Sequence, residues 1–247
     1  MKCVIHGSGG VGGYYGGCLA RACHEVFFIA RGAHLEAIQQ QGLSIKSAKG
    51  DFRIETPKSG ERCDPNFCPN LVIVAVKSWQ LPEITKEIKN YCTPSTLILP
   101  LQNGADASDI LADTLGPERV LGGLTKIFSK IEAPGVINHF TGATYIGFGE
   151  YFQDPQFQNA PDSLSERCRN LEKELDSTPG IDAEAFVDIQ KELWRKMLIF
   201  VSTSGVGTIT RTPNGVFRSI PETREMLIQL IREILMVGQA KKVNIGE

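Results

Sequence analysis

Residues 2–12 read KCVIHGSGGVG and decide the fold of this 247-residue chain. The apolar run predicts a strand, and it leads directly into Gly7, Gly9 and Gly12, which match G-x-G-x-x-G at the start of a predicted helix. In this pattern the first glycine allows a tight turn, the second lets the backbone approach a pyrophosphate, and the third lets helix and strand pack closely. Amides at the helix N-terminus attract an anion. We therefore predict a dinucleotide site, against the alternative of a glycine-rich turn without a ligand, formed by Gly7, Ser8, Gly9, Gly10, Val11 and Gly12.

The rest of the chain up to about residue 188 repeats a short apolar run, a polar or glycine turn and an amphipathic segment. This rhythm is typical of β-α-β units. We expect an α/β fold with a Rossmann-type, doubly wound and mainly parallel sheet. The expected strands are 2–6, 25–30, 71–76, 96–100, 119–124, 136–140, 144–148 and 183–187, with a short pair at 43–47 and 51–55. The expected helices are 11–23, 33–41, 82–91, 106–114 and 161–176.

The chain changes character after the helix stop signal STPG at 177–180 and the strand that follows. From Ile189 onward the pattern is helical, with one helix to about Ser204 and another from Pro221. Between them we expect interruptions at Gly205, Gly207 and Pro213. The predicted domains are a dinucleotide-binding domain over 1–188 and a smaller all-helical domain over 189–247. The helical part is short for an independent core, so we expect it to be incomplete and the chain to be truncated.

Composition and charge exclude several classes of partner. The chain has 26 basic and 28 acidic residues, a net charge of −2, which gives no excess positive field for nucleic acid or an anionic membrane. The longest clean apolar run, 71–76, is far below the roughly 20 residues of a membrane helix. The N-terminus has no signal-peptide core, and seven cysteines without a C-x-x-C pair indicate reduced thiols. We expect a cytoplasmic protein with a small-molecule substrate and no metal, nucleic-acid or membrane partner.

Arg31 lies at the end of the second predicted strand, where NAD enzymes carry Asp or Glu for the ribose hydroxyls. A guanidinium attracts a 2′-phosphate and accepts no hydrogen bond from a ribose hydroxyl. This position therefore predicts NADP(H) as the cofactor. His34 could add to the phosphate contact, and the alternative for Arg31 is a solvated surface charge.

Polar residues follow two further apolar runs, where ligands bind in open parallel sheets. KSWQ follows residues 71–76, and LQNG follows residues 96–100. We expect Lys77 and Gln80 to face the phosphate or ribose side of the cofactor, and Asn103 to place its amide near nicotinamide and substrate. The alternatives are an ordinary Asn-Gly turn at Asn103 and, for Trp79, a tryptophan that anchors the core or the loop.

A candidate general acid lies on the predicted helix 192–198, which reads ELWRKML. If Lys196 points into the cleft between the domains, its ammonium can hydrogen-bond a ketone oxygen and supply a proton as hydride arrives at the carbon. The alternative is a surface ion pair between Glu192 and Lys196, four residues apart.

Taken in order, these segments resemble the ketopantoate reductase (2-dehydropantoate 2-reductase) family. The resemblance spans essentially the whole chain, and its most specific part is ELWRK at 192–196, placed after the Asn-Gly pair. It implies NADPH-dependent reduction of ketopantoate to pantoate, on the route to pantothenate and coenzyme A. It also implies that Lys196 is the general acid, that Asn103 contacts both cofactor and substrate, and that Ser129, on the loop after a Gly-Gly pair, contacts the cofactor through its backbone.

The chain departs from the family pattern at the expected substrate side. Phe200 and Ser204 stand where the family places asparagines, Asn214 matches a later family asparagine, and further C-terminal helices with a serine and a glutamate are missing. We expect substrate contacts from Asn103, Lys196, Ser204 and Asn214. The alternatives are a reductase of a different 2-oxoacid, a non-catalytic NADP(H)-binding regulatory protein, and a β-hydroxyacid dehydrogenase. The apolar face of the last helix is compatible with a homo-oligomer.

Overall fold

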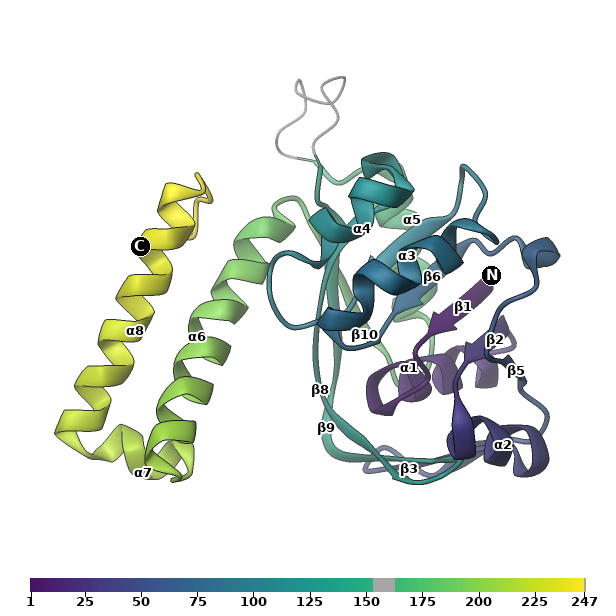
Figure 1. The fold of residues 1–247 in the computed structure, drawn as a ribbon, viewed down its shortest axis with the longest axis horizontal. Helices are drawn as coiled ribbons and strands as arrows, with labels where there is room; N and C mark the ends of the chain where they lie inside the picture. Colours follow the sequence, from purple (N-terminus) through teal and green to yellow (C-terminus); the bar gives the residue numbers. More distant parts are fainter. Residues whose placement is uncertain (153–162, 247) are drawn as a thin grey trace. The chain divides into compact units, whose positions relative to one another are not determined.

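The computed structural model describes residues 1–152 and 163–246 (Figure 1). They form two compact units. The first comprises Met1–Gln102 and Asp106–Ile189, and the second comprises Asn103–Ala105 and Gln190–Glu247. The first two positions of the helix expected over 161–176 lie outside the described residues.

The first unit is built on a sheet of five strands in the order β5-β2-β1-β6-β7. Every pair in it is parallel. The expected Rossmann-like parallel sheet is therefore confirmed; β5 is an additional edge strand that the sequence did not predict. The strands are β1 (Lys2–His6), β2 (Glu25–Ile29), β5 (Lys58–Gly60), β6 (Leu71–Val74) and β7 (Leu97–Pro100).

Successive side chains of β1 point to opposite faces of the sheet, and those on both faces are apolar. Both faces are therefore covered by helices. Cys3 and Ile5 enter a core that includes Tyr15, whereas Val4 enters a second core that includes Ile84. The helices that supply these cores are α1 (Gly10–Arg21), α2 (Gly32–Gln41), α3 (Leu81–Lys89), α4 (Ala107–Leu115) and α5 (Glu166–Asp176). The carboxyl ends of the strands, and the residues that follow them, are left at one edge.

A second sheet has the order β10-β9-β3-β4, with β8 paired to β9. The strands expected at 136–140 and 144–148 are one continuous strand, and the strand expected at 119–124 begins at Leu121 and runs on to Ala133. Together they form one long antiparallel hairpin, which Val120 joins to the parallel sheet through a bridge to Ile98. Its register shifts between Ile127 and Ser129 and again between Ile131 and Ala133, and such bulges break the alternation by which a strand is predicted. The elements are β3 (Leu43–Ser47), β4 (Phe52–Ile54), β8 (Leu121–Ala133), β9 (Val136–Glu150), β10 (Asp182–Phe186) and α5 (Glu166–Asp176).

The second unit contains α6 (Ile189–Thr210), α7 (Asn214–Ser219) and α8 (Pro221–Ala240). The expected break after Ser204 is wrong, because α6 continues through both glycines to Thr210. At Gly205 a Cβ would lie 3.5 Å from Leu230 of α8, and at Gly207 it would lie 3.5 Å from Phe217 of α7. A Cβ at either position would make only ordinary contacts, so the two glycines are tolerated inside the helix and do not end it. No helix within the described ranges combines the length and apolar character needed to cross a bilayer.

Candidate functional site

The glycine turn after β1 has the geometry that its sequence predicts. Gly7 has φ +102°, and a Cβ there would lie 2.9 Å from the backbone nitrogen of Val76. At Gly12 a Cβ would lie 2.2 Å from the carbonyl oxygen of Gly7. Side chains at either position would clash with backbone, so the turn and the close start of α1 both require glycine.

The N-terminus of α1 is open to an anion. Gly9 is the N-cap, and the position of a Cβ on it has no atom within 4 Å. The first bond closed inside the helix runs from Gly13 N–H to the Gly9 carbonyl at 2.7 Å, so the amides of the first turn have no acceptor within the helix. That turn carries no acidic residue. Free donors beside an unobstructed glycine fit a phosphate of a dinucleotide.

Ser8 and His34 hold this turn in place from inside the unit. The backbone N–H and the hydroxyl of Ser8 both donate to the Ile29 carbonyl, at 2.9 Å and 3.0 Å. His34 Nδ1 accepts from Gly135 N–H at 3.1 Å, so its Nε2 donates to the Ser8 carbonyl at 2.9 Å. Burial also lowers the pKa of His34. Both ring nitrogens thus bond the backbone and hold the turn, and a contact of this histidine with a phosphate stays a prediction.

Arg31, the N-cap of α2, is half-exposed and lies beside two carboxylates of α3. Its guanidinium is 3.9 Å from Glu83 and 3.7 Å from Glu87. Glu87 also contacts His6, whose Nε2 lies 3.7 Å from the Glu87 carboxylate. The other ring nitrogen, His6 Nδ1, lies 2.9 Å from the Tyr91 hydroxyl. Burial, and secondly the charge of Arg31, lowers the pKa of His6 to about 4. The imidazole is therefore neutral at physiological pH, and Arg31 is the cation of this group.

Lys77 and Gln80 follow β6 in a short 3-10 helix, η2 (Ser78–Gln80). The Lys77 N–H donates to Gln80 Oε1 at 3.0 Å, and the Gln80 N–H donates back to the Lys77 carbonyl at 2.9 Å. The glutamine oxygen is thus used to cap the turn, which leaves its NH2 group as a donor for a ligand. Trp79 between them is 78% exposed, so the alternative of a core tryptophan does not hold.

Gln102, which the sequence analysis did not single out, closes the end of the parallel sheet. Its side-chain nitrogen donates to the carbonyls of Val74 and Val76, at 3.0 Å and 3.1 Å. Its Oε1 is buried and accepts no hydrogen bond. Because Val76 also packs against Gly7, Gln102 links the loop after β6 to the glycine turn. Its place directly before Asn103, two residues after the end of β7, is the signal in the sequence.

Ser129 is part of β8 and not of a loop, which corrects the expectation. It pairs with His139 at the first register shift of the hairpin. Its carbonyl lies against Gly10, where a Cβ would be 2.5 Å from that oxygen, and its hydroxyl is buried without a hydrogen-bond partner. The structure therefore does bring Ser129 to the glycine turn.

In the second unit, Lys196 and Asn103 are hydrogen-bonded. Lys196 Nζ donates to Asn103 Oδ1 at 3.0 Å. Two positions earlier on α6, Trp194 is buried in a cluster against which Ala105 packs. Glu192 pairs with Arg195, whose Nη1 lies 2.8 Å from the carboxylate. The short segment after Gln102 is thus attached to the lysine helix by an apolar contact and by a polar one.

Comparison with known proteins identifies this arrangement. Residues 3–151 match the family model for ketopantoate reductase PanE/ApbA, and residues 188–247 match the model for the C-terminal part of the same family. The chain belongs to the ketopantoate reductase family. As a member of this family it is an oxidoreductase.

Among relatives of the ketopantoate reductase family, an uncharacterized oxidoreductase of Bacillus subtilis strain 168, YkpB, is 31% identical over 241 residues, covering 96% of this chain and 74% of that protein. A 2-dehydropantoate 2-reductase of Pyrococcus abyssi is 28% identical, covering 94% of this chain and 72% of that protein. The crystal structure of a PanE/ApbA family ketopantoate reductase from Ralstonia eutropha JMP134 has a TM-score of 0.85 at 26% identity, covering 100% of this chain and 77% of that chain. A D-mandelate dehydrogenase with NADH and anilino(oxo)acetate shares the fold at TM-score 0.86 and 21% identity, covering 98% and 75%.

The positions that depart from the ketopantoate reductase pattern lie along α6 and α7. Phe200 is 44% exposed and follows Lys196 by one helical turn. Ser204 lies two turns from Lys196, about 12 Å along the axis, and Asn214 is the first residue of α7. Both polar residues are exposed, and their roles toward a substrate stay predictions.

Proposed function

We propose that this protein reduces 2-dehydropantoate to pantoate with NADPH, as a step toward pantothenate and coenzyme A. The observation that carries the proposal is the Lys196–Asn103 hydrogen bond of 3.0 Å, in a chain that belongs to the ketopantoate reductase family. In this assignment the region 1–188 binds NADP(H), and the region from 189 onward supplies substrate contacts.

The cofactor side of the proposal rests on the turn after β1. The amides of Gly10, Val11 and Gly12 would hold a phosphate, Gly9 would give the backbone access to it, and Arg31 would bind the 2′-phosphate. The Ser129 carbonyl, Lys77 and the NH2 of Gln80 would complete the contacts. A bound reduced nicotinamide supplies the hydride.

The chemistry of the chain's own residues is proton donation and orientation. Asn103 Oδ1 accepts one N–H of Lys196 and so fixes the direction of the ammonium. A second N–H of that ammonium would donate to the ketone oxygen of the substrate and transfer its proton as the carbon receives hydride, which yields the alcohol. The Asn103 NH2 group, whose oxygen is engaged by the lysine, would donate to cofactor or substrate.

A different 2-oxoacid is a second candidate substrate, and Phe200 favours it. Its exposed ring lies one turn from Lys196, where the family pattern places an amide. An aromatic wall favours an apolar substrate side chain over one with a hydroxyl group.

The test is NADPH oxidation followed by absorbance, with 2-dehydropantoate and with branched and aromatic 2-oxoacids compared by kcat/KM. Lys196→Ala should lower kcat about 10²–10⁴-fold while leaving NADPH affinity, measured by fluorescence, unchanged. The matched control is Lys241→Ala, an exposed lysine of the same unit. Wild-type NADPH binding without turnover of any 2-oxoacid would instead support a regulatory binding protein.

A further inference from the structure

We propose that Glu83 and Glu87 of α3 set the cofactor selectivity of this protein, by holding Arg31 in ion pairs and lowering its preference for NADPH over NADH. The inference rests on the proposed function, in which Arg31 binds the 2′-phosphate. It adds two residues of another helix to that assignment and predicts that both cofactors are used.

The two carboxylates share one face of α3. They are four residues apart, and the apolar side chains of Ile84 and Ile88 turn the opposite face into the core. Glu83 approaches Arg31 Nη1 to 3.9 Å, and Glu87 approaches Arg31 Nη2 to 3.7 Å. The guanidinium is therefore engaged from one side by two anions before any ligand arrives.

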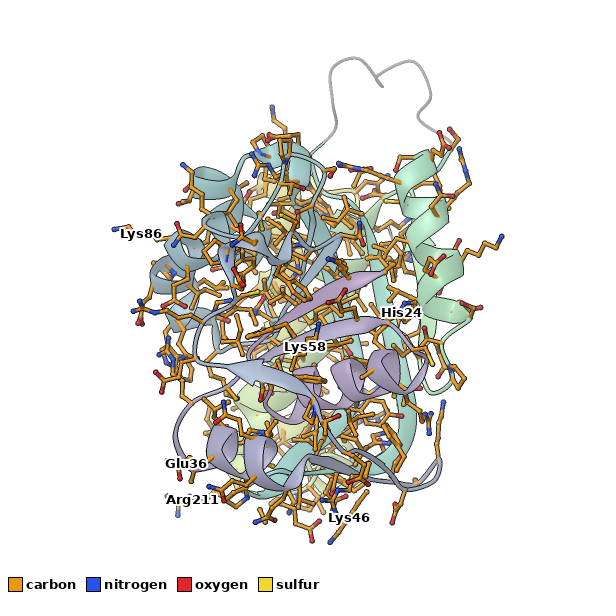
Figure 2. The ribbon with its side chains drawn as sticks, turned by 90° about the vertical axis from the view of Figure 1, so that its right-hand side faces the viewer. His24, Glu36, Lys46, Lys58, Lys86 and Arg211 are labelled. Atoms are coloured by element: carbon orange, nitrogen blue, oxygen red, sulfur yellow. The ribbon has the colours of Figure 1, made fainter. Side chains whose placement is uncertain are left out.

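Arg31 and the two glutamates that pair with it carry a net charge of −1. His6, on the far side of Glu87, is neutral because burial holds its pKa at about 4. Lys86 lies on the same helix but points away from the protein (Figure 2). One guanidinium thus faces two carboxylates, and one carboxylate oxygen of Glu87 is buried without accepting a hydrogen bond.

These charges act in opposite directions on the two cofactors. A 2′-phosphate brings further negative charge to the two carboxylates and must compete with them for Arg31. The free 2′-hydroxyl of NADH can donate to a carboxylate, which is how Asp or Glu at this sheet edge binds NAD in related folds. The structure thus combines a cation for NADPH with acceptors for NADH.

The experiment measures the dissociation constants of NADPH and NADH by fluorescence titration, without substrate. The wild-type ratio Kd(NADH)/Kd(NADPH) should be below about tenfold. Glu83→Gln and Glu87→Gln should each raise it about fivefold, which corresponds to about 1 kcal/mol for one unit charge at 4 Å in water. Arg31→Ala should lower it. Glu166→Gln on α5 makes the same change in net charge away from this group and should leave the ratio unchanged.

The outcomes separate this inference from the proposed function. If Arg31→Ala lowers the ratio and neither glutamate substitution raises it, the selectivity role of α3 is overturned and the NADPH assignment stands. If folded wild-type protein binds neither dinucleotide, both fail. Thermal unfolding of each variant checks folding, and Glu83→Gln, at an exposed position, keeps the test decisive if the more buried Glu87→Gln does not fold.

Discussion

Lys196 Nζ donates to Asn103 Oδ1 at 3.0 Å, although 93 positions separate the two residues in the sequence. The donor is the lysine ammonium and the acceptor is an amide oxygen, so the bond orients the lysine side chain. Asn103 is in this respect a positioning partner of the proposed acid, in addition to being a candidate ligand contact.

Asn103→Ala should therefore lower kcat while Lys196 is still present. A loss of orientation of about 1 Å at the acid can cost about a hundredfold in rate. Steady-state kinetics with the preferred 2-oxoacid measures the effect, and Asn170→Ala, on α5, serves as the control. Wild-type kcat in Asn103→Ala would contradict the positioning role.

Gln102→Leu should destabilise the protein and weaken dinucleotide binding. The substitution leaves the Val76 carbonyl, and one lone pair of the Val74 carbonyl, without the donor that now satisfies them. We expect the free energy of unfolding, measured with urea, to fall by about 1–3 kcal/mol. In Gln39→Leu, which removes an exposed bond of 3.3 Å to the Ser59 carbonyl, it should change by less than about 0.5 kcal/mol. Equal effects in the two variants would show that the buried amide has no special role.

Gly9→Ala should weaken NADPH binding without loss of stability, whereas Gly12→Ala should destabilise the protein. A Cβ at Gly9 meets no atom within 4 Å, so the melting temperature should hold while NADPH affinity falls, because the methyl group occupies the approach to the helix N-terminus. A Cβ at Gly12 would lie 2.2 Å from the Gly7 carbonyl, so this variant should lose about 1–3 kcal/mol of stability. Calorimetry with and without NADPH tests both predictions. Unchanged NADPH affinity in folded Gly9→Ala would show that the cofactor phosphate does not bind at this turn.

His6 should make stability depend on pH in the acidic range. Its pKa is about 4 in the native protein, lowered mainly by burial, and about 6.5 in the unfolded chain. Between these values the unfolded chain binds a proton that the native state does not, so the free energy of unfolding falls as pH falls from about 6.5 to 4, by at most about 3 kcal/mol from this group. His6→Asn, a neutral replacement, should flatten that slope in urea titrations at about pH 7 and about pH 5. An unchanged slope would assign the dependence to other groups.

The glycine turn and its strand could be predicted because their requirement is local: Gly7 and Gly12 are needed by the backbone of their own β-α unit. Asn103 is a candidate from its place after an apolar run, and Lys196 is a candidate acid on a predicted helix, but only the family resemblance gives them joint roles, because no spacing rule connects them. The long β8-β9 hairpin is not evident from the sequence because bulges interrupt its alternation. The full length of α6 is not evident either, because glycine inside a helix costs only about 1 kcal/mol and tertiary packing offsets it. The ion pairs of Arg31 could not be predicted from the sequence either, because Glu83 and Glu87 belong to a different helix, α3.

The three residues Asn103–Ala105 belong to the compact unit of Gln190–Glu247, yet the chain on both sides of them belongs to the other unit. The lysine helix and its amide partner are thus encoded in two separate places. A single crossover between the codons of Asn103 and Lys196, or a helical half transplanted as one block, would exchange Lys196 without Asn103. Chimeras that preserve the matched pair need a second exchange of only a few codons.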